Sequence, residues 1–175
     1  MKRKIKTYLD ASALWSLYYP EIDASIVEHV IQDKNHECTT SIWSTLELVR
    51  GTKKRENQGE LTHDDAKNLR HFIETDIKQL VHSTSLSLIP LSSEIVDFAK
   101  GLMIDLNLYS SDAVQLSTAI NEGCTIALVD DYHFKRLSSE IDARHGLKII
   151  PISITIEDFE NQNFAQALDR ENETE

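Results

Sequence analysis

The chain has 175 residues, 41% of them hydrophobic and 27% charged, with a formal net charge of -11. These proportions are typical of a globular protein, and the length suits one domain with a substantial core. The acidic balance argues against a protein that binds nucleic acid through bulk positive charge, but it does not exclude a nuclease whose acids hold metal ions. The chain has no apolar run of about 20 residues and no signal-peptide segment, so we expect a cytoplasmic protein.

The N-terminal part of the chain alternates between residues that favour strands and residues that favour helices. We expect a strand, a short helix, a second helix and a strand over residues 4–9, 13–18, 22–33 and 37–40. Ser12 is a suitable N-cap for the first of these helices, and Ser41 for a further helix from residue 42 to about residue 54. That third helix has Ile42, Leu46 and Val49 at helical spacing, which is typical of a face turned to the core.

The remainder of the chain continues the alternation. Thr62, with Asp65 three residues later, predicts the start of a long helix that ends near residue 81. Ser110 or Ser111 is expected to cap a later helix that stops at Gly123. The other expected strands and helices cover residues 86–91, 93–105, 125–129, 132–143 and 147–150.

Strands alternate with helices five times, which favours a parallel sheet with helices on both faces. We expect this α/β domain to cover residues 1–156 and an acidic C-terminal tail to cover residues 157–175. Cys38 and Cys124 lie in or beside apolar segments without the spacing of a zinc site, so we expect two buried free thiols.

Four acidic residues stand out by their positions. Asp10 follows the first predicted strand, and Asp112 lies in the first turn of an apolar helix. Glu47 lies between two leucines of the third helix, and Asp131 follows a buried strand, directly after Asp130. Each acid alone has an ordinary explanation, since Asp near a helix N-terminus gains roughly 0.3–1 kcal/mol from the helix dipole.

The joint placement of these acids indicates a metal site. The carboxyl ends of parallel strands share one edge of the sheet, where ligands bind in α/β proteins. Gathered carboxylates repel one another, and an unpaired buried ion costs several kcal/mol. A hard divalent cation offsets that cost, and oxygen ligands suit Mg²⁺ or Mn²⁺ better than zinc.

The chain resembles the PIN domain family, and within it the VapC-type toxins of toxin–antitoxin pairs. The resemblance covers about residues 4–150 and rests on four segments in order, Leu9-Asp10-Ala11-Ser12-Ala13-Leu14, Leu46-Glu47-Leu48-Val49-Arg50-Gly51, Ser111-Asp112-Ala113-Val114-Gln115-Leu116-Ser117-Thr118-Ala119 and Asp131-Tyr132-His133-Phe134. It implies a three-layer α/β/α fold with a five-stranded parallel sheet. It also implies an Mg²⁺-dependent endoribonuclease, with Mn²⁺ as an alternative ion, whose catalytic and metal-binding residues are Asp10, Glu47, Asp112 and Asp131.

One segment departs from the family pattern. The family often has Thr or Ser two residues before the fourth acid, whereas this chain has Val129 there and Asp130 between. Either Asp130 or Asp131 can therefore face the metal, and we favour Asp131 because the residues after it continue the pattern. Ser12 is either the N-cap or a contact to a metal-bound water or a phosphate.

The resemblance also implies partners. A toxin of this type is expected to form a homodimer and to bind an antitoxin that brings Arg or Lys into the acidic site. Two other functions stay open from the sequence. One alternative is a PIN-like RNA-processing nuclease without an antitoxin. The other is a non-catalytic α/β module that uses the acids to bind metal or a partner.

Overall fold

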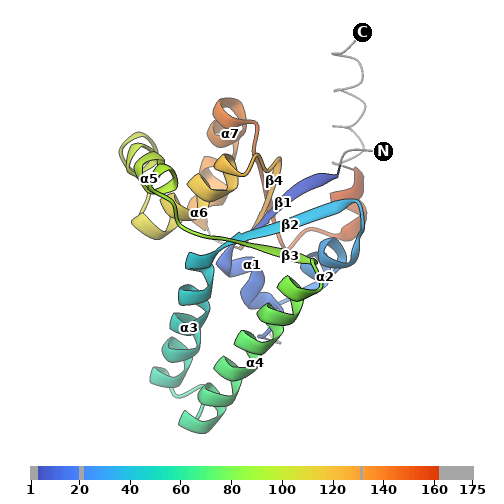
Figure 1. Cartoon of the computed structure of the whole chain (residues 1–175), viewed down its shortest axis with the longest axis vertical. Helices are drawn as coiled ribbons and strands as arrows, with labels where there is room; N and C mark the ends of the chain where they lie inside the picture. Colours follow the sequence, from blue (N-terminus) through green and yellow to red (C-terminus); the bar gives the residue numbers. More distant parts are fainter. Residues whose placement is uncertain (1–3, 20–21, 131, 162–175) are drawn as a thin grey trace.

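The computed structural model describes residues 4–19, 22–130 and 132–161. This part of the chain has five strands with one or two helices between successive strands, seven in all, and a short helical segment after the last strand (Figure 1). Their bounds are β1 Ile5–Leu9, α1 Ala11–Ser16, α2 Ser25–Gln32, β2 His36–Ser41, α3 Ile42–Asn57, α4 His63–His82, β3 Leu86–Ile89, α5 Ser93–Leu106, α6 Ser110–Asn121, β4 Ile126–Val129, α7 Tyr132–His145 and β5 Lys148–Pro151.

The five strands form one sheet in the order β3-β2-β1-β4-β5, and each neighbouring pair is parallel. Side chains of a strand point alternately to the two faces, so consecutive residues belong to different cores. Tyr8 and Ala127 lie in the core formed with α5, α6 and α7, whereas Leu9 and Leu128 lie in the core formed with α1, α2 and α4. The three-layer α/β/α fold with a five-stranded parallel sheet is therefore confirmed.

Two predicted helix starts are confirmed and two are wrong. The side chains of Ser41 and Thr62 accept backbone N–H groups and cap α3 and α4. Ser12, however, lies inside α1, and the cap is the Asp10 side chain, which accepts the Ser12 N–H. Neither Ser110 nor Ser111 caps α6, because the helix begins at Ser110 itself and the preceding Tyr109 makes no side-chain cap.

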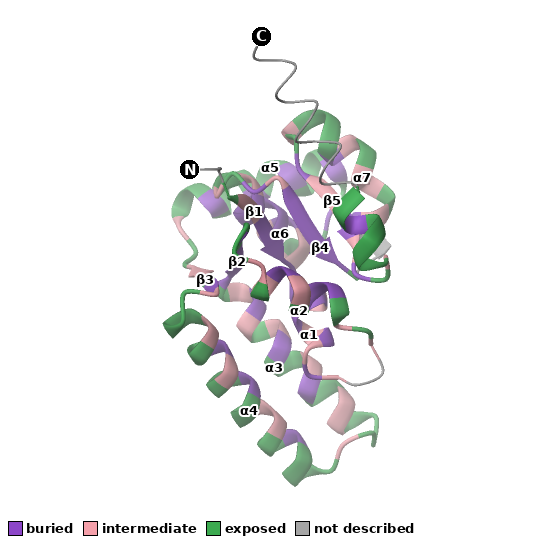
Figure 2. Ribbon diagram, turned by 90° about the vertical axis from the view of Figure 1, so that its right-hand side faces the viewer, coloured by how far each residue is buried: buried purple, intermediate pink, exposed green. Residues whose placement is uncertain are grey.

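The orientation of α3 also differs from the sequence-based expectation. Ile42, Leu46 and Val49 are 43%, 58% and 40% exposed. The buried residues of α3 are instead Ser44, Leu48 and Thr52. The cause is that α3 and α4 pack side by side as a pair that extends away from the sheet (Figures 1 and 2). The apolar stripe of α3 therefore faces outward.

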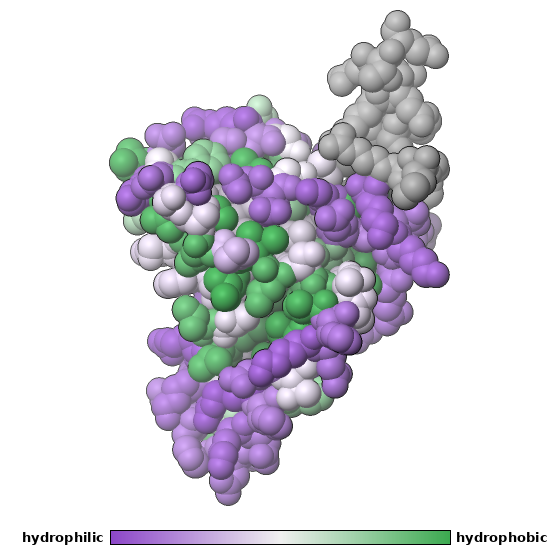
Figure 3. Space-filling model, viewed as in Figure 1, coloured by the Kyte–Doolittle hydropathy of each residue, from purple (hydrophilic) through white to green (hydrophobic). Residues whose placement is uncertain are grey.

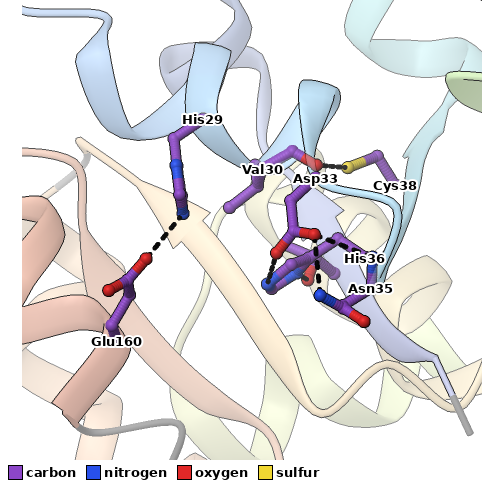
Figure 4. A network of polar contacts seen from close by, with 8 residues as sticks. His29, Val30, Asp33, Asn35, His36, Cys38 and Glu160 are labelled. Carbon is purple, nitrogen blue, oxygen red and sulfur yellow. Dashed lines mark hydrogen bonds and ion pairs between the residues drawn. The ribbon is translucent and has the colours of Figure 1, made fainter. Parts of the chain in front are cut away.

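The last described segment, residues 156–161, is helical and contacts α2 through His29. Phe159 is fully buried, with its ring stacked on His36 and edge-on to His29. His29 also lies 3.4 Å from the Glu160 carboxylate (Figure 4). Residues 162–175, the rest of the predicted tail, lie outside the described residues, and the predicted division at residue 156 stays a prediction.

Two further observations concern the rest of the described chain. Cys38 and Cys124 are buried free thiols, as predicted. Within the described ranges, no helix has the length and apolar character needed to cross a bilayer.

We predict that acid destabilises the fold through His36. This side chain is buried and shares a 2.7 Å hydrogen bond with Thr7. Burial lowers its pKa; Asp33 acts in the opposite direction, and His29 lowers the pKa further. Below the ordinary His pKa of about 6.5 the unfolded chain therefore binds more protons than the folded chain, so stability falls as the pH falls.

The measurement is the unfolding free energy by urea titration at pH 7.5 and pH 5. We expect the wild type to lose more stability than His36→Asn, which keeps a polar partner for Thr7 but does not titrate. Equal losses in both proteins would contradict the assignment to His36.

Candidate metal centre

A cleft of about 300 Å³ opens at the carboxyl end of β1 and β4. Its walls include Asp10 after β1, Glu47 of α3, Asp112 of α6 and Asp130 after β4. The fold therefore brings three of the four predicted acids together with the alternative fourth acid. The remaining one, Asp131, lies outside the described residues.

Asp10 is the most buried of these acids, with 5% of its surface exposed. Its Oδ2 accepts the Ser12 backbone N–H at 2.9 Å and the Ser12 hydroxyl at 2.6 Å. Burial raises the pKa of Asp10 to about 7; the hydrogen bonds from Ser12 oppose this shift, and the charge of Glu47 adds to it. The site therefore disfavours the charged form of Asp10, mainly because the carboxyl is buried and to a smaller extent because Glu47 is negative.

Ser12 connects two segments of the cleft. Its hydroxyl donates to Asp10, and its Oγ accepts the backbone N–H of Asp130 at 2.8 Å. The end of β4 is thereby tied to the end of β1 through one side chain. The Asp130 carboxylate itself is exposed and lies 3.1 Å from Lys135 Nζ.

Glu47 is positioned by Gln115 of α6, a residue that the sequence analysis did not single out. The Gln115 side-chain amide donates to Glu47 Oε2, and its carbonyl oxygen accepts from Tyr8 and from Ser44 at 3.0 Å. Burial raises the pKa of Tyr8 well above its usual value, so the phenol stays a neutral donor.

A signal for Gln115 exists in the sequence. It lies three residues after Asp112, one helical turn along the same face, among apolar neighbours of α6. Gln115 is only 2% exposed, and buried side-chain amides are expected to have hydrogen-bond partners.

Asp112 lies half-buried in the first turn of α6, where a negative charge is favoured by the helix dipole. The Ser111 hydroxyl lies 3.4 Å from its Oδ1. Asp112 therefore has a favourable position near the start of α6 and also lines the cleft, so its position is compatible with both a structural role and a metal-binding role.

The donor chemistry of the cleft fits Mg²⁺ or Mn²⁺. Its described walls contribute four carboxylates and neither imidazole nor thiolate, and hard divalent ions prefer such oxygen donors. As they stand, no three His, Cys, Asp or Glu side chains in the described ranges are gathered tightly enough to hold an ion.

The fold is similar to that of several solved proteins. A chain of the VapBC2 structure from Rickettsia felis, bound to a DNA fragment from the promoter, is 16% identical, with a TM-score of 0.56 over 84% of this chain and 98% of that one. PAE2754 from Pyrobaculum aerophilum is 15% identical, with a TM-score of 0.57 over 85% and 90% of the two chains. A chain of the FitAB structure, bound to the IR36 DNA fragment, is 11% identical, with a TM-score of 0.58 over 83% of this chain and 94% of that one.

No curated protein matches the chain in sequence. The family model of the PIN domain, in contrast, matches residues 7–140, a span that includes Asp10, Glu47, Asp112 and Asp130. The match thus covers most of the chain, and the parallel sheet agrees with it. The chain belongs to the PIN domain family.

Proposed function

We propose that the chain is a cytoplasmic, metal-dependent endoribonuclease and the toxin of a toxin–antitoxin pair. The observation that carries the proposal is that four separate segments deliver Asp10, Glu47, Asp112 and Asp130 to one cleft. PIN domains are nucleases, so this family membership favours phosphodiester hydrolysis over other chemistry at such a cleft. RNA as the substrate and Mg²⁺ as the ion are parts of the proposal.

In this proposal Asp10, Glu47, Asp112 and Asp131 hold the ion, with Asp130 as the alternative to Asp131. The ion, when bound, lowers the pKa of an attacking water and neutralises charge on the phosphate. The protein keeps the carboxylates in place, since Ser12 holds Asp10 and Gln115 holds Glu47. Such supporting groups fix the direction of the donor oxygens before an ion arrives.

A homodimer and an antitoxin complex are the proposed assemblies. The exposed apolar side chains of α3, at positions 42, 46 and 49, form one stripe at i, i+4 and i+7. Figure 3 shows that apolar surface gathers in the middle of one face of the molecule, with hydrophilic surface around it. Apolar surface of this kind favours contact with another protein. We assign the stripe to the second copy of this chain, and the acidic cleft to a basic segment of the antitoxin.

The main alternative is a non-catalytic module that binds metal or a partner through the same acids. It is favoured by the separation of the carboxylates, which do not form a ready ion site among the described residues. Metal titration together with an RNA cleavage assay separates the two functions, because the module would bind Mn²⁺ without turnover. A PIN-like RNA-processing nuclease would cleave RNA but have no antitoxin encoded beside it.

We predict that Asp10→Asn and Asp112→Asn each lower Mg²⁺-dependent RNA cleavage by at least about 10²-fold, the usual loss when a key electrostatic group is removed. The matched control is Asp97→Asn, which removes an exposed acid of α5 that pairs with Lys100. Rates on a labelled RNA, with and without Mg²⁺, give the measurement. Full activity in both cleft variants would reject the metal-site hypothesis.

We predict that Gln115→Leu weakens Mn²⁺ binding by about 10- to 100-fold, because supporting hydrogen bonds contribute that much at metal sites. Ser117→Ala is the control, since it removes another buried hydrogen bond of α6, which goes to the Ile95 carbonyl of α5 and not to Glu47. Isothermal titration with Mn²⁺ on folded protein gives the affinities. If both variants bind Mn²⁺ like the wild type, Gln115 has only a structural role.

We predict that Leu46→Glu converts a dimer into a monomer, because a charge in the apolar stripe of α3 must be desolvated when the second copy binds. Phe72→Glu is the control, since this residue is equally exposed, at 57%, but lies on α4. Light scattering after size exclusion gives the mass. A monomeric wild type would reject the homodimer.

A further inference from the structure

The wall of the cleft continues beyond the acids along α3. The residues of α3 that line the cleft include Glu47, Gly51, Lys54 and Arg55. The last three follow Glu47 by four, seven and eight residues, which puts all four on one face of the helix. Lys54 lies two turns after Glu47, which is about 10 Å along the helix axis. The acids and the cations therefore occupy opposite ends of one continuous surface.

An aromatic side chain and a glycine lie between these ends. Trp15 of α1 lines the cleft and packs against α3 at Gly51, where an added Cβ would lie 3.0 Å from the indole ring. The Trp15 ring stacks on Tyr19, with ring centres 5.8 Å apart. The middle of the cleft is thus formed by a flat aromatic group beside a helix that carries no side chain at that position.

The two cations differ in how they are held. The Arg55 guanidinium lies 4.1 Å above the Tyr19 ring and pairs with Glu60. Lys54 is exposed at the rim of the cleft. Among the described residues that line the cleft, these are the only Lys or Arg side chains.

Because the chain is acidic, cations that line the cleft indicate where a negatively charged strand could bind. With a net charge of -11 and several carboxylates in the cleft, the protein repels a polyanion unless cations lie along its path. Grooves for single-stranded nucleic acid combine cations that follow the phosphates with aromatic side chains. This cleft has both, since Trp15 lies between the acids at one end and Lys54 and Arg55 at the other.

We propose that Lys54 binds a phosphate of the RNA strand at a distance from the cleaved bond, so that a good substrate must extend from the acids past Trp15 to Lys54. This inference rests on the proposed endoribonuclease function and adds a length requirement to it. Lysine suits the role because its ammonium group binds phosphate as a point charge. The contact concerns substrate binding and leaves the reacting atoms to the acids.

The test compares Lys54→Gln, Lys54→Arg and Lys53→Gln on a series of single-stranded RNAs of increasing length. Lys53→Gln is the matched control, because it removes the same charge from the neighbouring residue, which pairs with Glu56 and does not line the cleft. Thermal melting of each variant checks that it is folded. The readouts are KM and kcat for each length, at low and at moderate salt.

We expect Lys54→Gln to raise KM roughly two- to fivefold on the long RNAs, the modest effect of one exposed ion pair, with kcat little changed. The defect should shrink on the shortest RNA that the wild type cleaves, and Lys54→Arg should restore KM. The salt dependence of KM should also weaken, because one phosphate contact is lost.

Two results would overturn the inference while the endoribonuclease function stands. One is a KM defect of equal size at every length. The other is a Lys54→Gln variant that matches Lys53→Gln on the long RNAs. A wild type that cleaves no RNA in the series overturns the proposed function, and with it the role of Lys54.

Discussion

The burial of an acidic side chain in the cleft is the constraint on which the rest of this structure depends. Asp10 is almost completely buried, and this burial is the main cost of ionising it, to which the negative charge of Glu47 adds. A fold with this arrangement is less stable than one with apolar residues in the same place, unless a cation enters. The helices and strands around the cleft must therefore hold carboxylates in a place where ionising them is costly.

The polar groups beneath the acids provide this hold. Tyr8 and Ser44 donate to the carbonyl oxygen of Gln115, which leaves the amide group of that residue directed at Glu47. Thr40 contributes as well, since its hydroxyl donates to the Leu9 carbonyl and lies 2.8 Å from the Ser44 hydroxyl. The network connects β1, the continuous segment of β2 and α3, and α6, so the position of Glu47 depends on three parts of the chain that are distant in sequence.

Much of the fold follows from local sequence patterns. Alternating strands and helices predict a parallel sheet with two helical layers, and acids at strand ends predict a shared cleft. The order of the strands requires contacts between distant segments, and no local pattern specifies it. The position of Asp10 was predicted correctly, but its role as the helix cap was assigned to Ser12, because both residue types are good caps.

The remaining differences have physical causes. The stripe at Ile42, Leu46 and Val49 has the spacing of a core face, and a surface that binds another protein has the same spacing. Sequence periodicity alone therefore cannot tell these two environments apart. Gln115 was missed because a neutral amide carries no charge pattern, and its importance depends on burial, which only the assembled helices reveal. The sequence thus predicted that Asp10, Glu47 and Asp112 lie near one another, but it did not predict the groups that orient them, and Asp131 stays a prediction.

The bond between Ser12 and Asp10 limits what this serine can do. A hydroxyl group has a single proton, and that of Ser12 is directed at a carboxylate oxygen 2.6 Å away. Its oxygen meanwhile accepts the N–H that follows β4. An anion that enters the cleft therefore meets lone pairs at Ser12 instead of a donor, and the hydroxyl is neither available for anion recognition nor set up as a nucleophile while both bonds persist.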